Sequence, residues 1–153
     1  MNFKKRCWDL DKALGRRGAP VRYALSAEKD RYIKHHRTFG GTAYVWLNSP
    51  DDLEGIRARI LPLDGIESVM TRMEPAAPFG LMPERIGELV VTGDEDTVFG
   101  ELQGECESLE NSYRSHGSLH EADVPMIIYN YRDPLPDGTR FRRNADVAHF
   151  LFR

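Results

Sequence analysis

Residues 42–71 constrain the fold most, because they read as a strand, a helix and a second strand in a row. Residues 42–47 are β-branched and aromatic, as expected of a strand in the core. Ser49 and Pro50 then form a typical helix start, with the serine as N-cap and the proline at the first position. The helix is expected to end near Pro62 and to bury four side chains, those of Leu53, Ile56, Ile60 and Leu61. A turn at Gly65 leads into a strand over residues 66–71, so this is a compact α/β unit.

The flanking sequence predicts further elements of both kinds. Apolar residues at helical spacing predict an amphipathic helix over residues 6–17, with Gly18 as its C-cap. Further expected elements are a strand over 21–25, a short irregular helix over 73–79, a strand over 86–93, a polar loop over 100–113 and a closing helix over 145–152 capped by Asn144. The chain is therefore expected to have an α/β fold.

A polar stretch from Arg114 to Pro125 carries the most distinctive chemistry. It holds two histidines and precedes the apolar run of residues 126–129, which predicts a loop feeding a buried strand. His116 stands beside Gly117, and a histidine next to a glycine can approach a metal ion with little steric hindrance. The spacing of His116 and His120 is a weak metal signal by itself, so an ordinary polar loop is the alternative.

Composition narrows the class of protein. The 153 residues are 41% hydrophobic and 29% charged, which fits one globular domain. The net charge of −3 does not favour binding to nucleic acid or to an anionic membrane. No apolar run is long enough to cross a bilayer. Cys7 and Cys106 lie far apart and predict free thiols in a reducing cytoplasm.

The motifs around His116 resemble the last metal-ligand segment of the alkaline phosphatase superfamily. The matching residues are Ser115-His116-Gly117-Ser118, His120-Glu121 and Val124-Pro125-Met126-Ile127. Residues 30–36, 42–47 and 85–91 occur in the same order as in phosphonoacetate hydrolases, which belong to the type I phosphodiesterase and nucleotide pyrophosphatase branch. The resemblance covers residues 1–130 and extends toward the end, and it concerns only the C-terminal part of such an enzyme.

This resemblance implies a fold, a reaction and a metal site. It implies part of an alkaline-phosphatase-like α/β/α fold, with residues 42–92 as a small inserted α/β subdomain. Enzymes of this family use two zinc ions to cleave the carbon–phosphorus bond of phosphonoacetate, giving acetate and phosphate. His116 matches a zinc ligand, whereas the nucleophile and the other ligands belong to an N-terminal half that has no counterpart here. Met1 falls where the metal-binding motif of that half would end.

Three hypotheses follow for what the chain does. In the first, it is part of a zinc hydrolase acting on a small phosphonate or phosphate ester, and it is inactive alone because one ligand cannot hold a catalytic zinc. In the second, it is a non-catalytic binding module or a half-enzyme completed by a partner chain. In the third, it is a small metal-binding protein that uses His116, His120, Glu121 and Asp123. A chain of this kind is expected to expose apolar sheet edges and apolar patches. It is therefore expected to form dimers or other homo-oligomers, to aggregate, or to keep a core limited to residues 42–91.

Other polar clusters are expected to be structural. Adjacent His35 and His36 would point to opposite faces of a strand, so they are not expected to share one ion. The acids of residues 94–96 predict a solvated turn. His149 is expected to be a surface or partly packed residue of the closing helix rather than a ligand. Glu88 is expected to have a structural role at its turn, and His120 is a candidate for a contact near the metal site.

Overall fold

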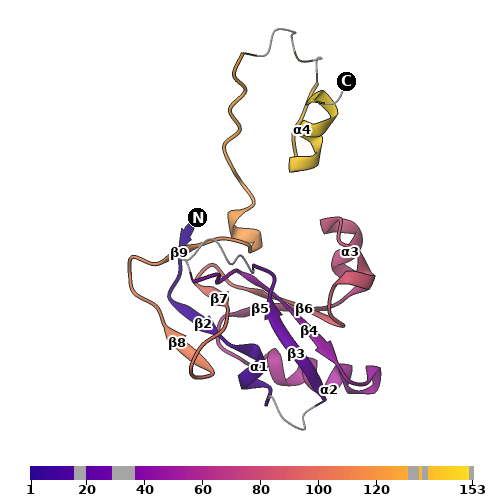
Figure 1. The fold of residues 1–153 in the computed structure, drawn as a ribbon, viewed down its shortest axis with the longest axis vertical. Coiled ribbons are helices and arrows are strands. Elements are labelled where there is room, and N and C mark those ends of the chain that lie inside the picture. The colour runs from indigo at the N-terminus through magenta and orange to yellow at the C-terminus, as the bar shows by residue number, and fades with distance from the viewer. Residues whose placement is uncertain (16–19, 29–36, 131–134, 136–137, 152–153) are drawn as a thin grey trace.

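A four-stranded antiparallel sheet forms the centre of the computed structural model, which describes residues 1–15, 20–28, 37–130, 135 and 138–151 (Figure 1). Its strands run in the order β3-β4-β6-β5. Their bounds are β3 (Val21–Ser26), β4 (Thr42–Leu47), β6 (Leu89–Gly93) and β5 (Ile66–Thr71). The predicted α/β unit is therefore present, and its sheet also takes in β3, which lies outside residues 42–92.

The helix between β4 and β5 begins where the sequence predicts. Ser49 accepts a hydrogen bond from the Asp51 amide, and a 3₁₀ turn, η1 (Pro50–Asp52), leads into α2 (Leu53–Ile60). Ile56 and Ile60 are buried, whereas Leu61 is 48% exposed because the helix ends one residue before it. The expectation that Leu61 faces inward is therefore wrong. After β5, the predicted irregular helix is α3 (Met73–Phe79), and a 3₁₀ turn, η2 (Pro83–Arg85), follows it.

The N-terminal residues build a second sheet instead of the predicted long helix. β2 (Arg6–Trp8) lies between β7 (Thr97–Phe99) and β8 (Cys106–Ser108), parallel to the first and antiparallel to the second. Asp9 then caps a single helical turn, α1 (Leu10–Ala13), by accepting a hydrogen bond from the Lys12 amide. Pairing with two distant strands thus overrides the helical spacing of residues 6–8. The predicted C-cap, Gly18, lies outside the described residues.

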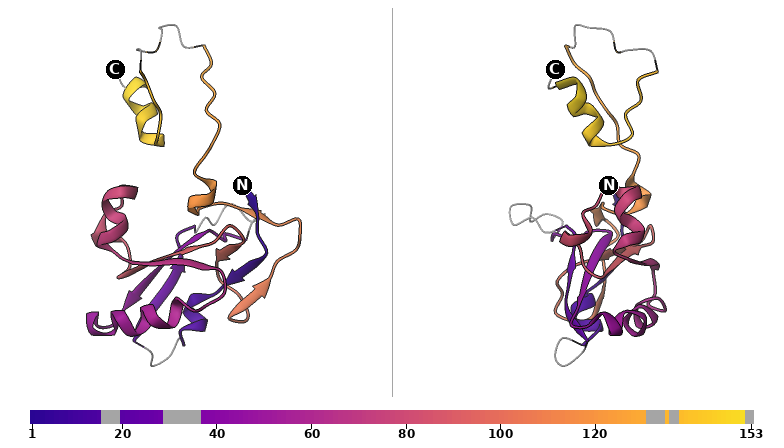
Figure 2. Two further views of the ribbon diagram at one scale, coloured as in Figure 1. Left: turned by 180° about the vertical axis from the view of Figure 1, so that it is seen from behind. Right: turned by 90° about the vertical axis from the view of Figure 1, so that its right-hand side faces the viewer.

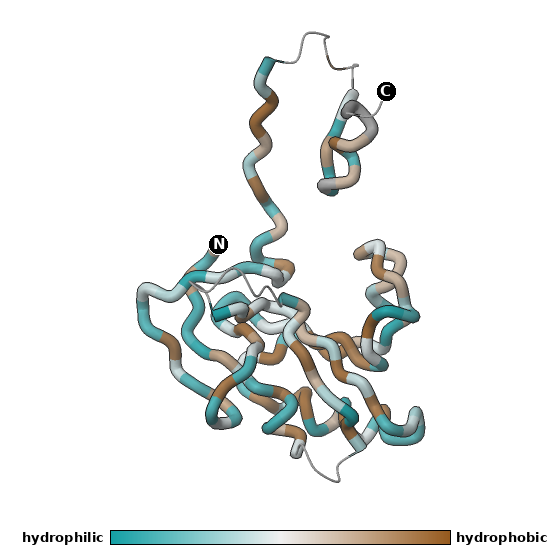
Figure 3. The backbone as a smooth tube through the Cα atoms, in the orientation of Figure 1, coloured by the Kyte–Doolittle hydropathy of each residue, from teal (hydrophilic) through white to brown (hydrophobic). Residues whose placement is uncertain are grey.

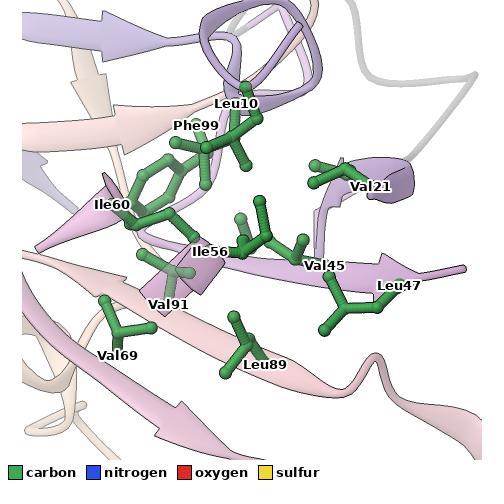
Figure 4. Packing of buried hydrophobic residues seen from close by; sticks show 13 residues of the cluster. Leu10, Val21, Val45, Leu47, Ile56, Ile60, Val69, Leu89, Val91 and Phe99 are labelled. Atoms are coloured by element: carbon green, nitrogen blue, oxygen red, sulfur yellow. The ribbon is translucent and has the colours of Figure 1, made fainter. Parts of the chain in front are cut away.

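The core lies between the four-stranded sheet, α1 and α2 (Figure 4). β4 contributes every second residue to it, since strand side chains alternate between faces. Its fully or nearly buried members include Leu10, Val21, Val45, Ile56, Ile60, Val69, Leu89, Val91 and Phe99. Because Leu10, Val21 and Phe99 belong to it, the core is not limited to residues 42–91.

Glu88 occupies a structural position at the start of β6. Its carboxylate accepts a hydrogen bond from the Leu47 amide at 2.8 Å and pairs with the Arg72 guanidinium. These contacts tie the end of β4 to the segment between β5 and α3. The expected structural role of Glu88 at its turn therefore agrees with its contacts.

Two segments after residue 100 differ from the structure that the sequence predicts for them. The polar stretch of residues 100–113 contains β8, so it is not only a loop. The apolar run of residues 126–129 forms no strand among the described residues and stands away from the body in every view (Figures 1 and 2). The prediction of a buried strand there is wrong, because no described strand lies beside this run to satisfy its backbone.

A last helix, α4 (Asn144–Leu151), agrees with the predicted closing helix. Arg143, just before it, donates a hydrogen bond to the Pro78 carbonyl of α3 at 3.0 Å. Asn144 lies within the helix rather than before it, and the Asp146 carboxylate accepts hydrogen bonds from the Arg142 and Arg143 amides instead. None of the helices that can be placed is long and apolar enough to cross a bilayer. Cys7 is buried, Cys106 is exposed, and both are free thiols, as predicted.

Candidate functional site

The turn that carries His116 is held against the start of β4, an inner strand of the central sheet. β9 (Arg114–Ser115) pairs with β1 (Asn2–Phe3), so the N-terminus fixes the approach to the turn. The Gly41 amide donates to the His116 carbonyl at 2.9 Å, and the Thr42 hydroxyl donates to the Gly117 carbonyl at 2.6 Å. These bonds place the backbone of His116 next to the start of β4.

Two glycines make this close approach possible. Gly117 has a φ of 93°, a conformation that residues with a side chain rarely adopt. A Cβ atom at Gly41 would lie 2.5 Å from the Ser118 Cβ and 2.7 Å from the Ser118 amide nitrogen. The His116 turn therefore fits only because neither position carries a side chain.

A buried ion pair anchors the far end of the turn. The 3₁₀ turn η3 (Leu119–Glu121) is closed by a capping box in which Ser118 and Glu121 exchange hydrogen bonds. The Glu121 carboxylate also lies 2.7 Å from the Lys4 ammonium, and their side chains are 4% and 0% exposed. Burial alone would raise the pKa of Glu121, but the hydrogen bonds from Lys4 and Ser118 lower it by more than burial raises it. The pKa of Glu121 therefore lies below its ordinary value. Lys4 additionally donates to the Glu95 carbonyl at 2.8 Å.

His116 itself is partly exposed and faces a carboxylate. Its side chain is 38% exposed, and its Nδ1 lies 3.6 Å from a carboxylate oxygen of Glu28. This separation exceeds a hydrogen bond, but the arrangement is typical of metal-binding histidines, which direct one ring nitrogen toward a carboxylate and the other toward the metal. The position of Glu28 beside Nδ1 and the partial exposure of the ring are thus compatible with a role of His116 as a metal ligand.

The other residues of the proposed metal cluster point elsewhere. His120 Nε2 lies 3.1 Å from the Glu67 carboxylate of β5, and Glu121 is committed to Lys4. Within the described part of the chain, no group of three or more His, Cys, Asp or Glu side chains could hold a metal ion. The structure therefore does not bring His116, His120, Glu121 and Asp123 into one site, and zinc would need ligands that the described residues do not provide.

A hollow of about 440 Å³ lies between α1, β3 and the segment after β7. Five carboxyl side chains and two basic ones line it. Both basic groups already have acidic partners, because Arg37 forms a bidentate pair with Glu107, and Lys12 pairs with Asp9. A dianion would meet net negative charge there, so the hollow does not fit a phosphonate.

The remaining candidate residues divide into two groups. His35 and His36 lie outside the described residues, as does the side chain of His149. In residues 94–96, the Asp94 carboxylate accepts from the Asp96 amide, and Asp96 pairs with the exposed Lys5, as in an ordinary turn.

Sequence reasoning missed the buried Lys4 and the carboxylate of Glu28, because only pairing across more than 80 residues places them beside the His116 turn.

Comparison with known proteins gives the same relationship as the motifs. No family model matches the sequence. A phosphonoacetate hydrolase from Sinorhizobium meliloti 1021, solved in complex with phosphonoformate, superposes with a TM-score of 0.60 at 26% identity over 74% of this chain. The same enzyme in complex with phosphonoacetate gives a TM-score of 0.57 and 29% identity over 72% of this chain. The chain spans only 28% and 27% of those structures.

This partial coverage agrees with a match to one part of a larger enzyme. Similarity of fold and of sequence extends over about three quarters of the chain, and it includes a shared mixed α/β architecture. The resemblance to part of phosphonoacetate hydrolase that the motifs around His116 predict is thereby confirmed.

Proposed function

We propose that this chain forms the part of a phosphonoacetate-hydrolase-like enzyme that supplies one zinc ligand, His116. The observation that supports this most is the 26–29% identity to phosphonoacetate hydrolase over almost three quarters of the chain. The substrate class would be a small phosphonate, since the similar structures hold phosphonoformate and phosphonoacetate. In such an enzyme zinc neutralises the phosphoryl oxygens and activates the nucleophile.

The contribution of this chain would be to position His116 and to keep its ring in one orientation. The hydrogen bonds to Gly41 and Thr42 fix the backbone, and Glu28 faces Nδ1. Catalytic zinc sites need about three protein ligands. With one candidate ligand among the described residues, the isolated chain is expected to be inactive toward phosphonoacetate.

A chimeric enzyme tests the proposal directly. In the Sinorhizobium meliloti phosphonoacetate hydrolase, the segment similar to this chain is replaced by residues 1–153 of this chain. The chimera should release phosphate from phosphonoacetate in the presence of zinc, and His116→Ala should abolish the release. His120→Ala is the matched control, because His120 pairs with Glu67 and should leave most activity intact. A chimera that folds, by its circular dichroism and melting curve, but stays inactive would contradict the proposal.

The second candidate function is that of a half-enzyme completed by a separate chain. The exposed apolar run of residues 124–129 favours it, since such a run is unusual on the surface of a monomer. Pull-down of a tagged chain from its own cells would test this candidate. A reproducible partner that contains the nucleophile and the other zinc ligands would support it, and recovery of the tagged chain alone would contradict it.

A further inference from the structure

The turn before the Gly40-Gly41 pair has a strained backbone. Arg37 and Thr38 have φ angles of 53° and 57°, a left-handed conformation that residues with a side chain rarely adopt. Threonine is especially unfavourable there, because its side chain branches at Cβ. In the described part of the chain, Asn130 is the only other residue with a side chain and a positive φ. Strain of this kind persists only where surrounding contacts hold it, and it is concentrated at functional sites.

An ion pair with β8 holds the first residue of this turn. The Arg37 guanidinium donates two hydrogen bonds to the Glu107 carboxylate, at 2.6 and 3.0 Å. It also lies over the Phe39 ring, 4.4 Å from the ring centroid. The hydrogen bonds from Arg37 hold the pKa of Glu107 below its ordinary value, so the pair is ionised at neutral pH. Exposed ion pairs contribute little on average, but the bidentate geometry and the ring contact make this pair better suited than most to hold a turn.

The residues after the turn are fixed on the other side. The Phe39 side chain is 1% exposed and packs against Cys7 and Val98, among the hydrophobic stretches that the strands carry through the body of the molecule (Figure 3). Gly40 exchanges two backbone hydrogen bonds with Phe99, at 3.1 and 2.7 Å. The strain is thus confined between the ion pair and a rigid segment.

This rigid segment contacts both residues at the start of the His116 turn. The Ser115 hydroxyl donates a hydrogen bond to the Phe39 carbonyl. The Gly41 amide donates to the His116 carbonyl at 2.9 Å. A change of φ in the strained turn would therefore move the backbone to which His116 is bound.

The same segment also positions the carboxylate that faces the His116 ring. A Cβ atom at Gly40 would lie 2.6 Å from the Glu28 Cβ, so the Glu28 side chain lies directly against this backbone. The Glu28 amide donates to the Ser26 hydroxyl at 3.2 Å, which fixes the start of the side chain. Movement of Gly40 would therefore change the place of Glu28 as well.

We propose that Arg37 and Glu107 are positioning residues for His116. Their ion pair keeps the turn in its strained conformation, and the turn sets the places of His116 and Glu28. This inference rests on the proposed function, because it assigns these two residues a role in holding the zinc ligand. Without the pair, the turn would relax toward negative φ and carry the His116 turn with it.

Two glycine substitutions test whether the turn is strained in solution. Thr38→Gly should raise the melting temperature of the full chain, because glycine adopts a positive φ without a steric penalty. Ala27→Gly is the matched control, since Ala27 lies just after β3 and is not among the residues with positive φ, and it should lower the melting temperature. A fall in melting temperature for Thr38→Gly as large as for the control would show that the turn is unstrained and would overturn the inference.

The NMR resonances of the His116 ring report its position in the full chain without any metal. Glu107→Gln keeps the shape of the side chain but removes its charge, so it should shift or broaden these resonances. Asp96→Asn is the matched control, because Asp96 forms an ion pair of similar length with Lys5, 2.7 Å, outside residues 37–41. It should leave the His116 resonances unchanged. Unchanged resonances in Glu107→Gln would overturn the inference.

A double variant shows whether the effect passes through the strained turn. Adding Thr38→Gly to Glu107→Gln removes the reason for the turn to relax, so the His116 resonances should return to their places in the unsubstituted chain. If they stay displaced, the ion pair acts on His116 by another route and the inference is wrong.

Zinc binding by the chimera separates failure of this inference from failure of the proposed function. Glu107→Gln should lower the zinc affinity by about tenfold, the smallest loss typical of groups that orient a metal ligand. If His116→Ala removes zinc but Glu107→Gln leaves the affinity unchanged, this inference fails and the proposed function stands. If His116→Ala keeps its zinc while Glu107→Gln displaces the His116 ring, the proposed function fails and the positioning of His116 by the ion pair stands.

Discussion

The buried ion pair between Lys4 and Glu121 should stabilise the fold far more than the exposed ion pair between Lys5 and Asp96. Lys4→Met keeps most of the buried aliphatic stem but removes the ammonium. The Glu121 carboxylate, 4% exposed, then loses its charge partner, and the Glu95 carbonyl loses a donor at 2.8 Å. Removing one partner of a buried pair costs about 3–5 kcal/mol. Because Ser118 still donates to Glu121 through its amide and its hydroxyl, we expect the lower end, about 3 kcal/mol.

Urea unfolding measures this loss. With a slope of about 1.5 kcal/mol per molar urea, a loss of about 3 kcal/mol lowers the midpoint by about 2 M. Lys5→Met is the matched control, since Lys5 also pairs with a carboxylate at 2.7 Å but is 71% exposed. The reasoning is refuted if the two variants shift the midpoint equally, or if Lys4→Met shifts it by less than about 0.5 M.

Three further predictions concern the site and its surroundings. Because the pKa of Glu121 is lowered in the folded state, its carboxylate stabilises the fold fully above about pH 4.3, and this contribution is lost as the pH falls through the folded-state pKa. Glu121→Gln should therefore make the unfolding free energy fall less steeply below about pH 4.3. An equally steep fall in the variant would contradict the assignment. Burial raises the pKa of the Cys7 thiol and shields it, so Ellman's reagent at pH 8 should modify Cys106 in the native chain and Cys7 only after unfolding. Equal rates of modification of the two thiols in the native chain would show that Cys7 of β2 is not buried. Gly41→Ala should displace the His116 turn and therefore broaden or shift the NMR resonances of the His116 ring. Gly55→Ala is the control, because a Cβ atom there would meet nothing within 4 Å, and it should leave these resonances unchanged. Identical His116 resonances in both variants would contradict the close approach of Gly41 to the turn.

Local signals in the sequence were sufficient where the structure is local. The Ser49-Pro50 start of the helix and the β-branched and aromatic composition of β4 are signals within a few neighbouring residues, and both elements were predicted from them. The resemblance carried by residues 115–118 was also readable, because it lies in one short motif.

Contacts between distant residues account for the errors. Residues 6–8 have helical spacing, yet they form a strand because β7 and β8, about 90 and 100 residues away, pair with both of its edges. Lys4 stands at the start of three consecutive basic residues, with no local signal of burial, yet its side chain is buried against Glu121. The run of residues 126–129 has the composition of a buried strand but finds no strand beside it among the described residues.

The zinc content of the purified chimera tests the central claim most directly. If His116 is a zinc ligand, His116→Ala should lower the zinc content by about one ion per chain relative to the unsubstituted chimera. His120→Ala should leave the content unchanged, because His120 pairs with Glu67. Equal zinc content in the His116→Ala and unsubstituted chimeras, both folded, would show that His116 does not bind the metal.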